Sequence, residues 1–414
     1  MRILFHALHY GPDPGGAGPF NSQLGAWLVE RGHEVTVIST PPHYPQWEVA
    51  EAYRGRGAVH EVIDGVDVHR VPLYVPSAEE LGARTRILHE TSFNVSSLRR
   101  LVPELFTRPG YDLVLSICPP LQTAVSGLAY ARARRIPFVF FLHDLQVDQA
   151  VDLGMIRNPR AVRAMYAIER SILRRSSLVA THTPEMRRRV IAKGVDERDT
   201  VLLPTWADTD TITPAERDND FRRELGVDLD TTLVLYAGGM GEKHGLDTVL
   251  EAAHELDDRT DIEFVLIGAG PKRAELEAAA ARMQLHHLRF WPLQPLDRMP
   301  EILAAGDVHL VIQKGDAADL MMPAKLTSIL AAGRASVGTA VTGTAVAEVL
   351  EGEGAGVVVA PDDPAALAAG IARLAADPDL RTRLGEGARS YAERVLSRDV
   401  VLGAFERRLL ELLA

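Results

Sequence analysis

The chain has almost no cysteine: Cys118 is the only one among 414 residues. A single cysteine cannot form an intramolecular disulfide, which excludes a disulfide-rich secreted fold and fits a reducing cytoplasm. Cys118 stands between an apolar run and Pro119, without the partners that a catalytic thiol needs. We therefore interpret it as buried core filler.

Long apolar runs are also missing. No run approaches the roughly 20 residues that a membrane-spanning helix needs, and residues 136–142 have the composition of a buried strand. The first predicted strand, residues 2–5, begins too early to leave room for a signal peptide. We expect a cytoplasmic protein and leave open a peripheral contact with the inner face of the membrane.

The chain as a whole lacks an excess of positive charge, since its net charge is −11. Residues 204–414 carry −14 and residues 1–203 carry +3, so the acidic second half excludes a dedicated nucleic-acid binder. Residues 157–193 nevertheless contain ten arginines and lysines. This stretch fits either contact with a membrane surface or an anionic ligand, or a solvated helix face.

The spacing of the histidines matches no common metal-binding motif. No HExxH pattern occurs, and no two histidines are separated by three residues. His286 and His287 are adjacent, so they would point in different directions on a strand or a helix. The sequence therefore predicts no metal and no other cofactor.

One pattern is present twice: an apolar strand, a glycine-rich loop, an amphipathic helix and a second strand. It spans residues 2–40 and again residues 232–268. Alternating buried strands and amphipathic helices are typical of doubly wound parallel sheets, and 414 residues are too many for one ordinary core. We expect two Rossmann-like domains joined by a turn-rich linker at 204–214. Further strands are predicted at 113–117, 138–142, 178–181, 308–312 and 356–359.

The second glycine loop, "GGMGEKHG", has the features of a phosphate site. Gly238, Gly239 and Gly241 let backbone amides approach a ligand, and Lys243 adds a cation at an expected helix start. His244 stands where a Walker A loop requires Ser or Thr and where a dinucleotide fingerprint requires Gly. The loop therefore predicts phosphate binding outside these two motifs.

Several stretches in the same order resemble the retaining family 4 glycosyltransferases of the GT-B fold. They are "GGAGPFNSQLGAWLVERGHEVTVIST", "YAGGMGEKHGLDTVLEAA" and "LMMPAKLTSILAAGRASVGT". Within that family the chain is most similar to colanic-acid-type exopolysaccharide enzymes, through "LHDLQVDQA", "LPTWADTD", "PLQPLDRM" and "DAADLMMPAKLT".

The resemblance implies two Rossmann-like doubly wound domains facing an interdomain cleft. Residues 1–205 would bind the acceptor, residues 215–395 the nucleotide-sugar, and residues 396–414 would form a helix packing back towards the first domain. The implied activity is metal-independent sugar transfer with retention, in polysaccharide or natural-product biosynthesis. A GDP-sugar is slightly favoured as donor, and the acceptor is either a small molecule or a lipid-linked saccharide.

The resemblance also assigns residues to the donor. The family's arginine five residues before the lysine is replaced by Gly238, and Lys325 is the candidate replacement charge. The second glutamate of the family's Glu-x7-Glu pair aligns with Ser328 and the first with Leu320, which leaves Asp319 or Asp316 as a substitute. The expected donor-binding residues are Gly15, Gly16, Gly18, Gly239, Gly241, Glu242, Lys243, Gly268, Gln294, Asp316, Asp319, Met322, Pro323, Lys325 and Ser328.

His143 and Asp144 follow a predicted strand at its carboxyl end, where ligands of such sheets bind. We expect catalytic roles for His143, Asp144 and Lys243, with Asp144 orienting the His143 ring; a purely structural histidine is the alternative. The expected acceptor-side residues are Tyr10, His89, Ser92 and Asn94.

Two other functions stay open from the sequence. A sugar-nucleotide epimerase of the same fold would need no acceptor segment, whereas residues 84–100 are similar in layout to that of the exopolysaccharide enzymes. A catalytically weak sugar-nucleotide-binding protein is suggested by Gly238 and Ser328. The sequence leaves the oligomeric state undetermined.

Overall fold

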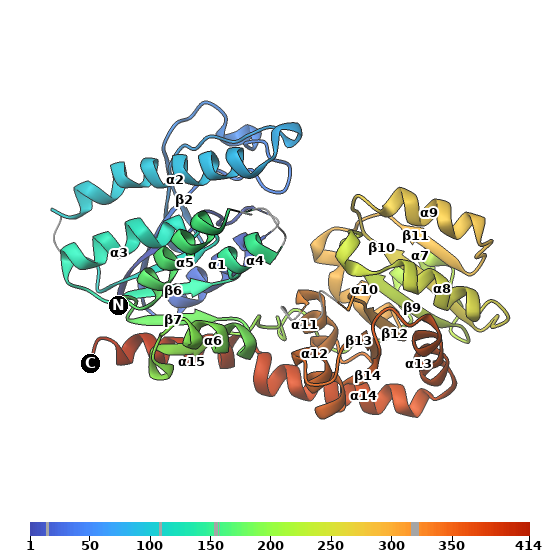
Figure 1. The fold of residues 1–414 in the computed structure, drawn as a ribbon. Coiled ribbons are helices and arrows are strands. Elements are labelled where there is room, and N and C mark those ends of the chain that lie inside the picture. Colours follow the sequence, from blue (N-terminus) through green and yellow to red (C-terminus); the bar gives the residue numbers. More distant parts are fainter. Residues whose placement is uncertain (14–15, 107–109, 153–155, 157, 316–322) are drawn as a thin grey trace. The chain divides into compact units, whose positions relative to one another are not determined.

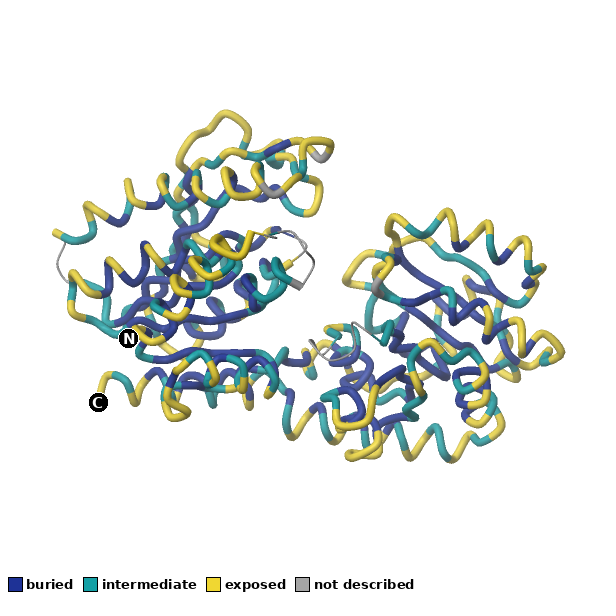
Figure 2. The backbone as a smooth tube through the Cα atoms, viewed as in Figure 1, coloured by how far each residue is buried: buried dark blue, intermediate teal, exposed yellow. Residues whose placement is uncertain are grey.

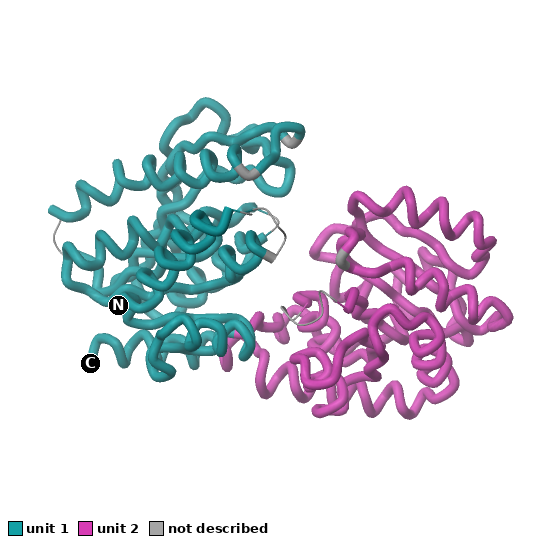
Figure 3. The backbone as a smooth tube through the Cα atoms, viewed as in Figure 1, with its two compact units in different colours: residues 1–203, 402–414 teal, residues 204–401 magenta. Residues whose placement is uncertain are grey.

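The computed structural model describes residues 1–13, 16–106, 110–152, 156, 158–315 and 323–414 (Figure 1). The chain divides into two compact units. Unit 1 comprises residues 1–203 and 402–414, and unit 2 comprises residues 204–401 (Figure 3). The prediction of two Rossmann-like α/β halves is confirmed.

Unit 1 contains an eight-stranded sheet in the order β3-β4-β2-β1-β5-β6-β7-β8. Neighbours are parallel except β3 and β4, which pair antiparallel. The strands are β1 (Arg2–His6), β2 (Glu34–Ser39), β3 (Val59–Ile63), β4 (Val66–Arg70), β5 (Leu113–Cys118), β6 (Phe138–Leu142), β7 (Leu178–Thr181) and β8 (Thr200–Leu202).

The helices of unit 1 cover this sheet and bury its central strands (Figure 2). Strands β5, β6 and β7 are buried at every position, as expected for parallel strands covered on both faces. The helices are α1 (Gly18–Glu30), α2 (Ala83–Glu104), α3 (Gln122–Arg134), α4 (Gln146–Asp152), α5 (Pro159–Leu173) and α6 (Pro184–Ala192), with 3-10 turns at Glu51–Tyr53, Ala78–Glu80 and Glu197–Asp199.

The β3–β4 hairpin was not predicted from the sequence. It turns at Asp64 and Gly65, which both have positive φ (49° and 77°). An Asp-Gly pair with two positive φ values is the favoured two-residue hairpin turn, so this dipeptide was the signal for the hairpin.

Unit 2 contains a six-stranded, all-parallel sheet in the order β11-β10-β9-β12-β13-β14. Its strands are β9 (Thr232–Ala237), β10 (Ile262–Ile267), β11 (Leu288–Trp291), β12 (Val308–Val311), β13 (Ser336–Thr339) and β14 (Gly356–Val359). Its helices are α7 (Asp220–Leu225), α8 (Asp247–Glu255), α9 (Arg273–Arg282), α10 (Met299–Ala305), α11 (Ala324–Ala331), α12 (Ala345–Ala347), α13 (Pro364–Ala376) and α14 (Pro378–Tyr391). Single turns lie at Glu242–His244, Leu296–Arg298, Glu348–Gly352 and Ala392–Leu396.

The segment expected to be a linker, 204–214, is packed into unit 2. Ala207 donates its amide to the carbonyl of Leu396 at 2.7 Å, and Ile212 is buried. Arg389 donates to the carbonyls of Thr209 and Ile212. Ala207, Thr209 and Ile212 are therefore held on unit 2, because α14 and the turn after it supply their hydrogen-bond partners.

The last helix, α15 (Arg398–Glu411), belongs from Leu402 onward to unit 1. Glu406 accepts a 2.7 Å hydrogen bond from Nε2 of His33 and pairs with Arg31 at 3.3 Å, and the Phe405 ring lies 6.5 Å from that of Phe141. Within the described residues, no helix is both long and apolar enough to cross a membrane.

Candidate functional site

The carboxyl end of β9 is where unit 2 can hold a ligand. β9 comes first in the unit and pairs with β10 on one side and β12 on the other, so the strand order reverses there. In doubly wound sheets ligands bind outside the strand ends at such a switch point. The loop of residues 238–241 therefore lies at the expected place.

The loop of residues 238–241 packs closely on the loop that follows β10, backbone against backbone. A Cβ on Gly268 would lie 1.9 Å from the carbonyl oxygen of Gly238, and one on Gly270 would lie 2.4 Å from that of Met240. Gly268 and Gly270 also have φ of +153° and +156°. Glycine is required at both positions for the two loops to pack this closely, and contact of Gly268 with a donor stays a prediction.

The amides of the loop are less available than the sequence suggested. Those of Gly238 and Met240 donate to the carbonyls of Ile267 and Ala269, at 3.0 and 2.9 Å. The amide of Gly241 lies 3.0 Å from Nδ1 of His244. The amide of Gly239 donates to no described residue, so it is the loop amide left for a phosphate oxygen.

The sequence predicted that a helix begins at Lys243, and this prediction is wrong. Residues Glu242–His244 form a single 3-10 turn, and α8 begins only at Asp247, because Gly245 adopts a left-handed conformation and interrupts the helix. The position of the Lys243 side chain lies outside the described part of the structure. The helix dipole argument therefore does not apply at Lys243.

Glu242 is held by cations of its own chain. Its carboxylate accepts a hydrogen bond from Lys314 and lies 3.2 Å from Lys272, and these lysines lower the pKa of Glu242. Lys272 also pairs with Asp247 at 3.1 Å. Sequence reasoning missed Lys272 and Lys314, whose only signal is their place just after β10 and β12.

Lys325 lies beside the glycine loop. Its Nζ is buried and sits 3.8 Å from the centre of the Tyr236 ring, a cation–π contact at the end of β9. A Cβ built on Gly238 would lie 2.9 Å from this Nζ. The Tyr236 hydroxyl donates to the carbonyl of Gly239 at 2.6 Å, which ties the loop to the same pair. The fold therefore places the candidate replacement charge next to Gly238.

The other expected donor residues are placed as follows. Pro323 precedes the first residue of α11, and Ser328 lies half-buried in that helix. Gln294 follows β11, donates to the carbonyl of Pro292 and accepts from Arg298. Asp316, Asp319 and Met322 lie outside the described residues.

In unit 1 the first glycine loop connects β1 to α1. Gly16 has φ of +63° and packs on Tyr44, and Gly18 is the first residue of α1. A Cβ on Gly18 would lie 2.9 Å from Cβ of Asp13. Gly15 lies outside the described residues. The two described glycines thus serve the turn itself, and their contact with a donor stays a prediction.

His143 follows β6 and belongs to a half-buried histidine pair. Its Nδ1 lies 2.7 Å from Nε2 of His182, whose Nδ1 lies 2.9 Å from the carbonyl of Leu203. A carbonyl only accepts, so His182 donates through Nδ1 and accepts through Nε2. Burial lowers the pKa of His182 to about 4 and that of His143 well below its usual value. His143 therefore donates to His182 through Nδ1, and its Nε2 lies 3.3 Å from the side-chain oxygen of Asn21.

The expected partnership of His143 with Asp144 is wrong. The ring nitrogens of His143 contact His182 and Asn21, the latter at 3.3 Å. Asp144 accepts a hydrogen bond from Gln149 at 2.9 Å. The two side chains of consecutive residues leave the strand end in different directions, so His182 orients the ring.

The four expected acceptor-side residues are used within the chain. Tyr10 is 1% exposed and packs against Phe5 and Gly25, so the prediction that it contacts the acceptor is wrong. His89 and Ser92 on α2 bond the carbonyl and the amide of Tyr74, at 2.6 and 2.8 Å. Asn94 bonds the Glu90 carbonyl and the Ser126 hydroxyl. These hydrogen bonds within the chain explain why polar residues occur at these positions of α2.

Sequence reasoning missed Glu90. Its carboxylate on α2 accepts from Gln122, which follows β5, at 3.3 Å and from Gln146, which follows β6, at 3.0 Å. Burial raises the pKa of this carboxyl group. No local motif marks Glu90, because the two glutamines that hold it come from distant positions in the chain.

Two simpler predictions can be compared with the structure directly. Cys118 is buried and burial raises the pKa of its thiol, which confirms the interpretation as core filler. In the basic stretch, several charges are paired with acidic residues, which favours the solvated-face interpretation. These pairs are Arg187–Glu197, Arg188–Glu185 and Arg189–Glu185. Lys193 differs, since it is half-buried and pairs with Asp148 and with the buried Glu169.

Known proteins are similar to this chain in sequence and in fold. A glycosyl transferase 4-like domain matches residues 15–206, and a glycosyl transferases group 1 domain matches residues 231–377. The chain is 36% identical over 411 residues to the colanic acid biosynthesis glycosyl transferase WcaI of Escherichia coli (strain K12), covering 98% of each chain. It is 29% identical over 419 residues to a D-inositol 3-phosphate glycosyltransferase of Geodermatophilus obscurus, covering 94% of this chain and 85% of that one. Sucrose-phosphate synthase from Thermosynechococcus elongatus superposes with a TM-score of 0.73 at 19% identity, covering 99% of this chain and 100% of that one.

Proposed function

Because the chain belongs to the family 4 glycosyltransferases of the GT-B fold, we propose that it transfers a sugar from a nucleoside-diphosphate sugar to an acceptor hydroxyl. The anomeric configuration is retained, and the product enters a polysaccharide. The full-length similarity to an enzyme named for colanic acid biosynthesis supports this class of product. A GDP-sugar is the first donor to test.

The observation that carries the proposal is the cation beside the glycine loop. Sugar transfer leaves negative charge on the departing diphosphate, so a donor site needs fixed positive charge where that charge develops. Lys325 lies at the switch point next to Gly238, with its ammonium held over Tyr236 at 3.8 Å from the ring centre. The amide of Gly239, which donates to no described residue, adds to it, and we propose that Lys243 supplies a second charge.

These protein cations supply the charge that a metal supplies in other transferases. We therefore propose that neither a metal nor an organic cofactor takes part in the departure of the diphosphate. His143 contributes from unit 1 through a hydrogen bond between a sugar hydroxyl and its Nε2, which lies 3.3 Å from the side-chain oxygen of Asn21 in this structure. Glu90 serves the acceptor, since its half-buried carboxylate is held in place by two glutamine amides.

The exposed face of α2 favours a lipid-linked acceptor over a soluble one. Leu88, Val95, Leu98 and Val102 are 44–52% exposed, and their spacing places them along one side of the helix. Arg84, Arg86 and Arg99 are exposed on the same helix. An apolar stripe with arginines nearby matches an anionic membrane surface, where the charges meet lipid phosphates.

A donor panel tests the proposed function. The enzyme is incubated with GDP-, UDP-, dTDP- and ADP-sugars and a polyprenyl-diphosphate saccharide, and released nucleotide and glycosylated lipid are measured together. Equimolar nucleotide and product, with the anomeric configuration retained by NMR, is the expected result. Epimerised donor without product would indicate an epimerase, and binding without turnover would indicate a nucleotide-sugar-binding protein.

A further inference from the structure

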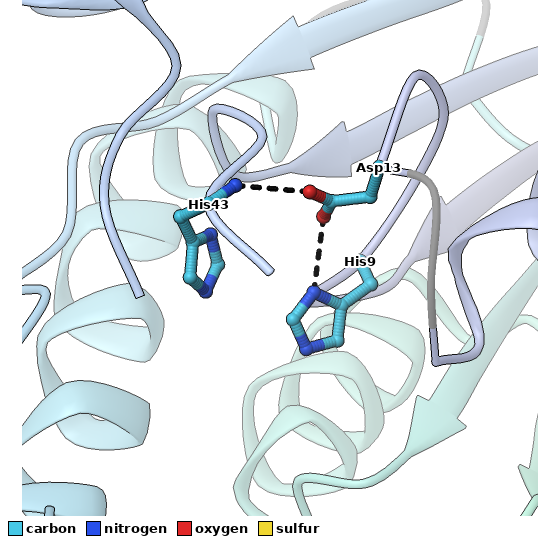
Figure 4. Close-up of side chains that lie close together, drawn as sticks. All are labelled: His9, Asp13 and His43. Carbon is cyan, nitrogen blue, oxygen red and sulfur yellow. Dashed lines mark hydrogen bonds and ion pairs between the residues drawn. The ribbon is translucent and has the colours of Figure 1, made fainter. Parts of the chain in front are cut away.

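His9, Asp13 and His43 come together in unit 1 where β1 and β2 end (Figure 4). His9 and Asp13 follow β1, and His43 follows β2, its parallel neighbour in the sheet. One donor atom of each residue lies within 4.8 Å of the donor atoms of the other two. Asp13 and His43 are each 2% exposed. Two imidazoles and a carboxylate thus converge on one largely buried point.

The carboxylate of this trio is fixed by the backbone. Oδ1 of Asp13 accepts from the amides of His43, at 2.9 Å, and Tyr44, at 3.3 Å. Its Oδ2 lies 3.1 Å from Nδ1 of His9. Two ligands on one tetrahedral cation, each at 2.0–2.1 Å, are about 3.3 Å apart. The spacing of Asp13 and His9 is therefore close to that of two metal ligands.

Nε2 of His43 presents a lone pair that no described residue uses. Its Nδ1 lies 2.9 Å from the carbonyl of Pro41, which can only accept, so the proton sits on Nδ1. Its Nε2 is buried and has no hydrogen-bond partner among the described residues. A buried acceptor without a partner destabilises the fold, whereas a metal-bound histidine uses such a nitrogen and donates its other N–H to a carbonyl.

A second trio in the same unit provides a comparison. His60, Asp67 and His69 also lie within 4.8 Å of one another, on the β3–β4 hairpin. His60 is exposed there, and Nη2 of Arg100 lies 3.3 Å from Nε2 of His69. A guanidinium at that distance opposes a second cation. The hairpin trio is better explained as a surface ion-pair cluster.

We propose that His9, Asp13 and His43 bind one divalent first-row transition-metal ion, of which Zn²⁺ is the representative. Two imidazole nitrogens and one carboxylate suit such ions, whereas Mg²⁺ and Ca²⁺ prefer oxygen ligands. Three protein ligands leave the fourth position to water or another oxygen ligand. The bound ion fastens the loop carrying Gly16 and Gly18 to the loop after β2. This site is separate from the proposed departure of the diphosphate, which takes place at unit 2 residues.

Zn²⁺ binding to the whole, untagged chain after dialysis against chelator tests the proposal. Isothermal titration at pH 7.5 is expected to give one equivalent of tightly bound Zn²⁺ for the wild type. His9→Gln and Asp13→Asn should each weaken binding at least about a hundredfold, since second-shell changes alone cost 10–100-fold. His69→Gln, in the hairpin trio, should bind as the wild type does.

No stoichiometric binding by the wild type, or equal affinity in Asp13→Asn, would overturn the proposal. Far-UV circular dichroism of each metal-free variant establishes that it is folded. If a variant does not fold, the visible spectrum of the Co²⁺-loaded wild type decides. Strong tetrahedral absorption, lost on adding one equivalent of Zn²⁺, supports the site, and the weak spectrum of hydrated Co²⁺ overturns it. No nucleotide-sugar is present, so the result is independent of sugar transfer.

Discussion

The ammonium of Lys325 lies where a side chain on Gly238 would begin: a Cβ built on Gly238 would be 2.9 Å from Lys325 Nζ. The two residues are 87 positions apart in the sequence, and the carboxyl end of β9 brings them together. A cation reaches the glycine loop from α11 because the loop residue itself has no side chain. The loop and its charge therefore form one structural unit.

Lys325→Met is expected to lower kcat/KM for the nucleotide-sugar by about 10- to 100-fold. A hydrogen bond to a charged group contributes about 1.5–3 kcal/mol, and each 1.4 kcal/mol is tenfold in rate. Steady-state kinetics with released nucleotide measures this. Lys325→Arg keeps the charge and should retain more activity. An equal loss of affinity for nucleoside and nucleoside diphosphate would show that Lys325 supports only the fold.

Gly268→Ala is expected to destabilise unit 2 by more than about 2 kcal/mol, because the new Cβ would overlap a backbone carbonyl and the φ of +153° is unfavourable for alanine. Denaturant unfolding measures the change. Gly352→Ala is the matched control, since nothing lies within 4 Å of a Cβ there. Equal stability of the two variants would contradict the close packing of the β9 and β10 loops.

The stability of the protein should fall as the pH is lowered below 6.5. His309 in unit 2 is 1% exposed, lies 2.9 Å from the Leu303 carbonyl through Nε2, and has its pKa lowered to about 4 by burial. The unfolded chain binds this proton at a higher pH than the folded chain, so the stabilising contribution is present above pH 6.5 and is lost as the pH falls towards 4. One such group contributes about 2 kcal/mol between pH 6.5 and 5.

Denaturant unfolding of wild type and His309→Gln at several pH values measures this contribution. The variant should lose less stability between pH 6.5 and 5 than the wild type does, whatever its stability at pH 7. His254→Gln, at an exposed position, should keep the wild-type slope. Parallel slopes for wild type and His309→Gln would show that His309 is not the group that titrates.

Glu90→Gln is expected to lower kcat/KM for the acceptor by about tenfold, with the KM for the donor unchanged. The amide can no longer accept from both Gln122 and Gln146, and a charge-assisted hydrogen bond to the acceptor, worth about 1.5–3 kcal/mol, is lost. Initial rates with each substrate varied in turn separate the two effects. A change confined to thermal stability would make Glu90 a structural residue.

Replacing Val95 and Leu98 by glutamate should reduce binding to vesicles of phosphatidylcholine and phosphatidylglycerol by at least about tenfold. The two charges would put unpaired carboxylates in the apolar face of α2 and repel anionic lipid. Co-sedimentation measures the bound fraction. Thr382→Glu is the control, because it adds one negative charge at an exposed position of α14 in unit 2. Wild-type vesicle binding by the α2 variant would argue for a soluble acceptor.

The sequence by itself determined the two α/β halves and most of their strands. Runs such as Phe138–Leu142 are apolar at every position, and only a strand covered on both faces buries all of them. The glycine loops were recognisable from their place after an apolar strand and before an amphipathic helix, whereas the backbone contact that requires Gly268 was visible only in the structure. Membership of the glycosyltransferase family also follows from the sequence.

Only the tertiary structure decided which side chains meet. Lys325 reaches Gly238, Gln122 and Gln146 hold Glu90, and His182 rather than Asp144 orients His143. Each of these groups joins residues from different strand ends, and a parallel sheet sets their proximity by strand order, which local spacing does not encode. Burial acted in the same way: it turned Tyr10 into a core residue and left Nε2 of His43 without a partner among the residues that the structure describes.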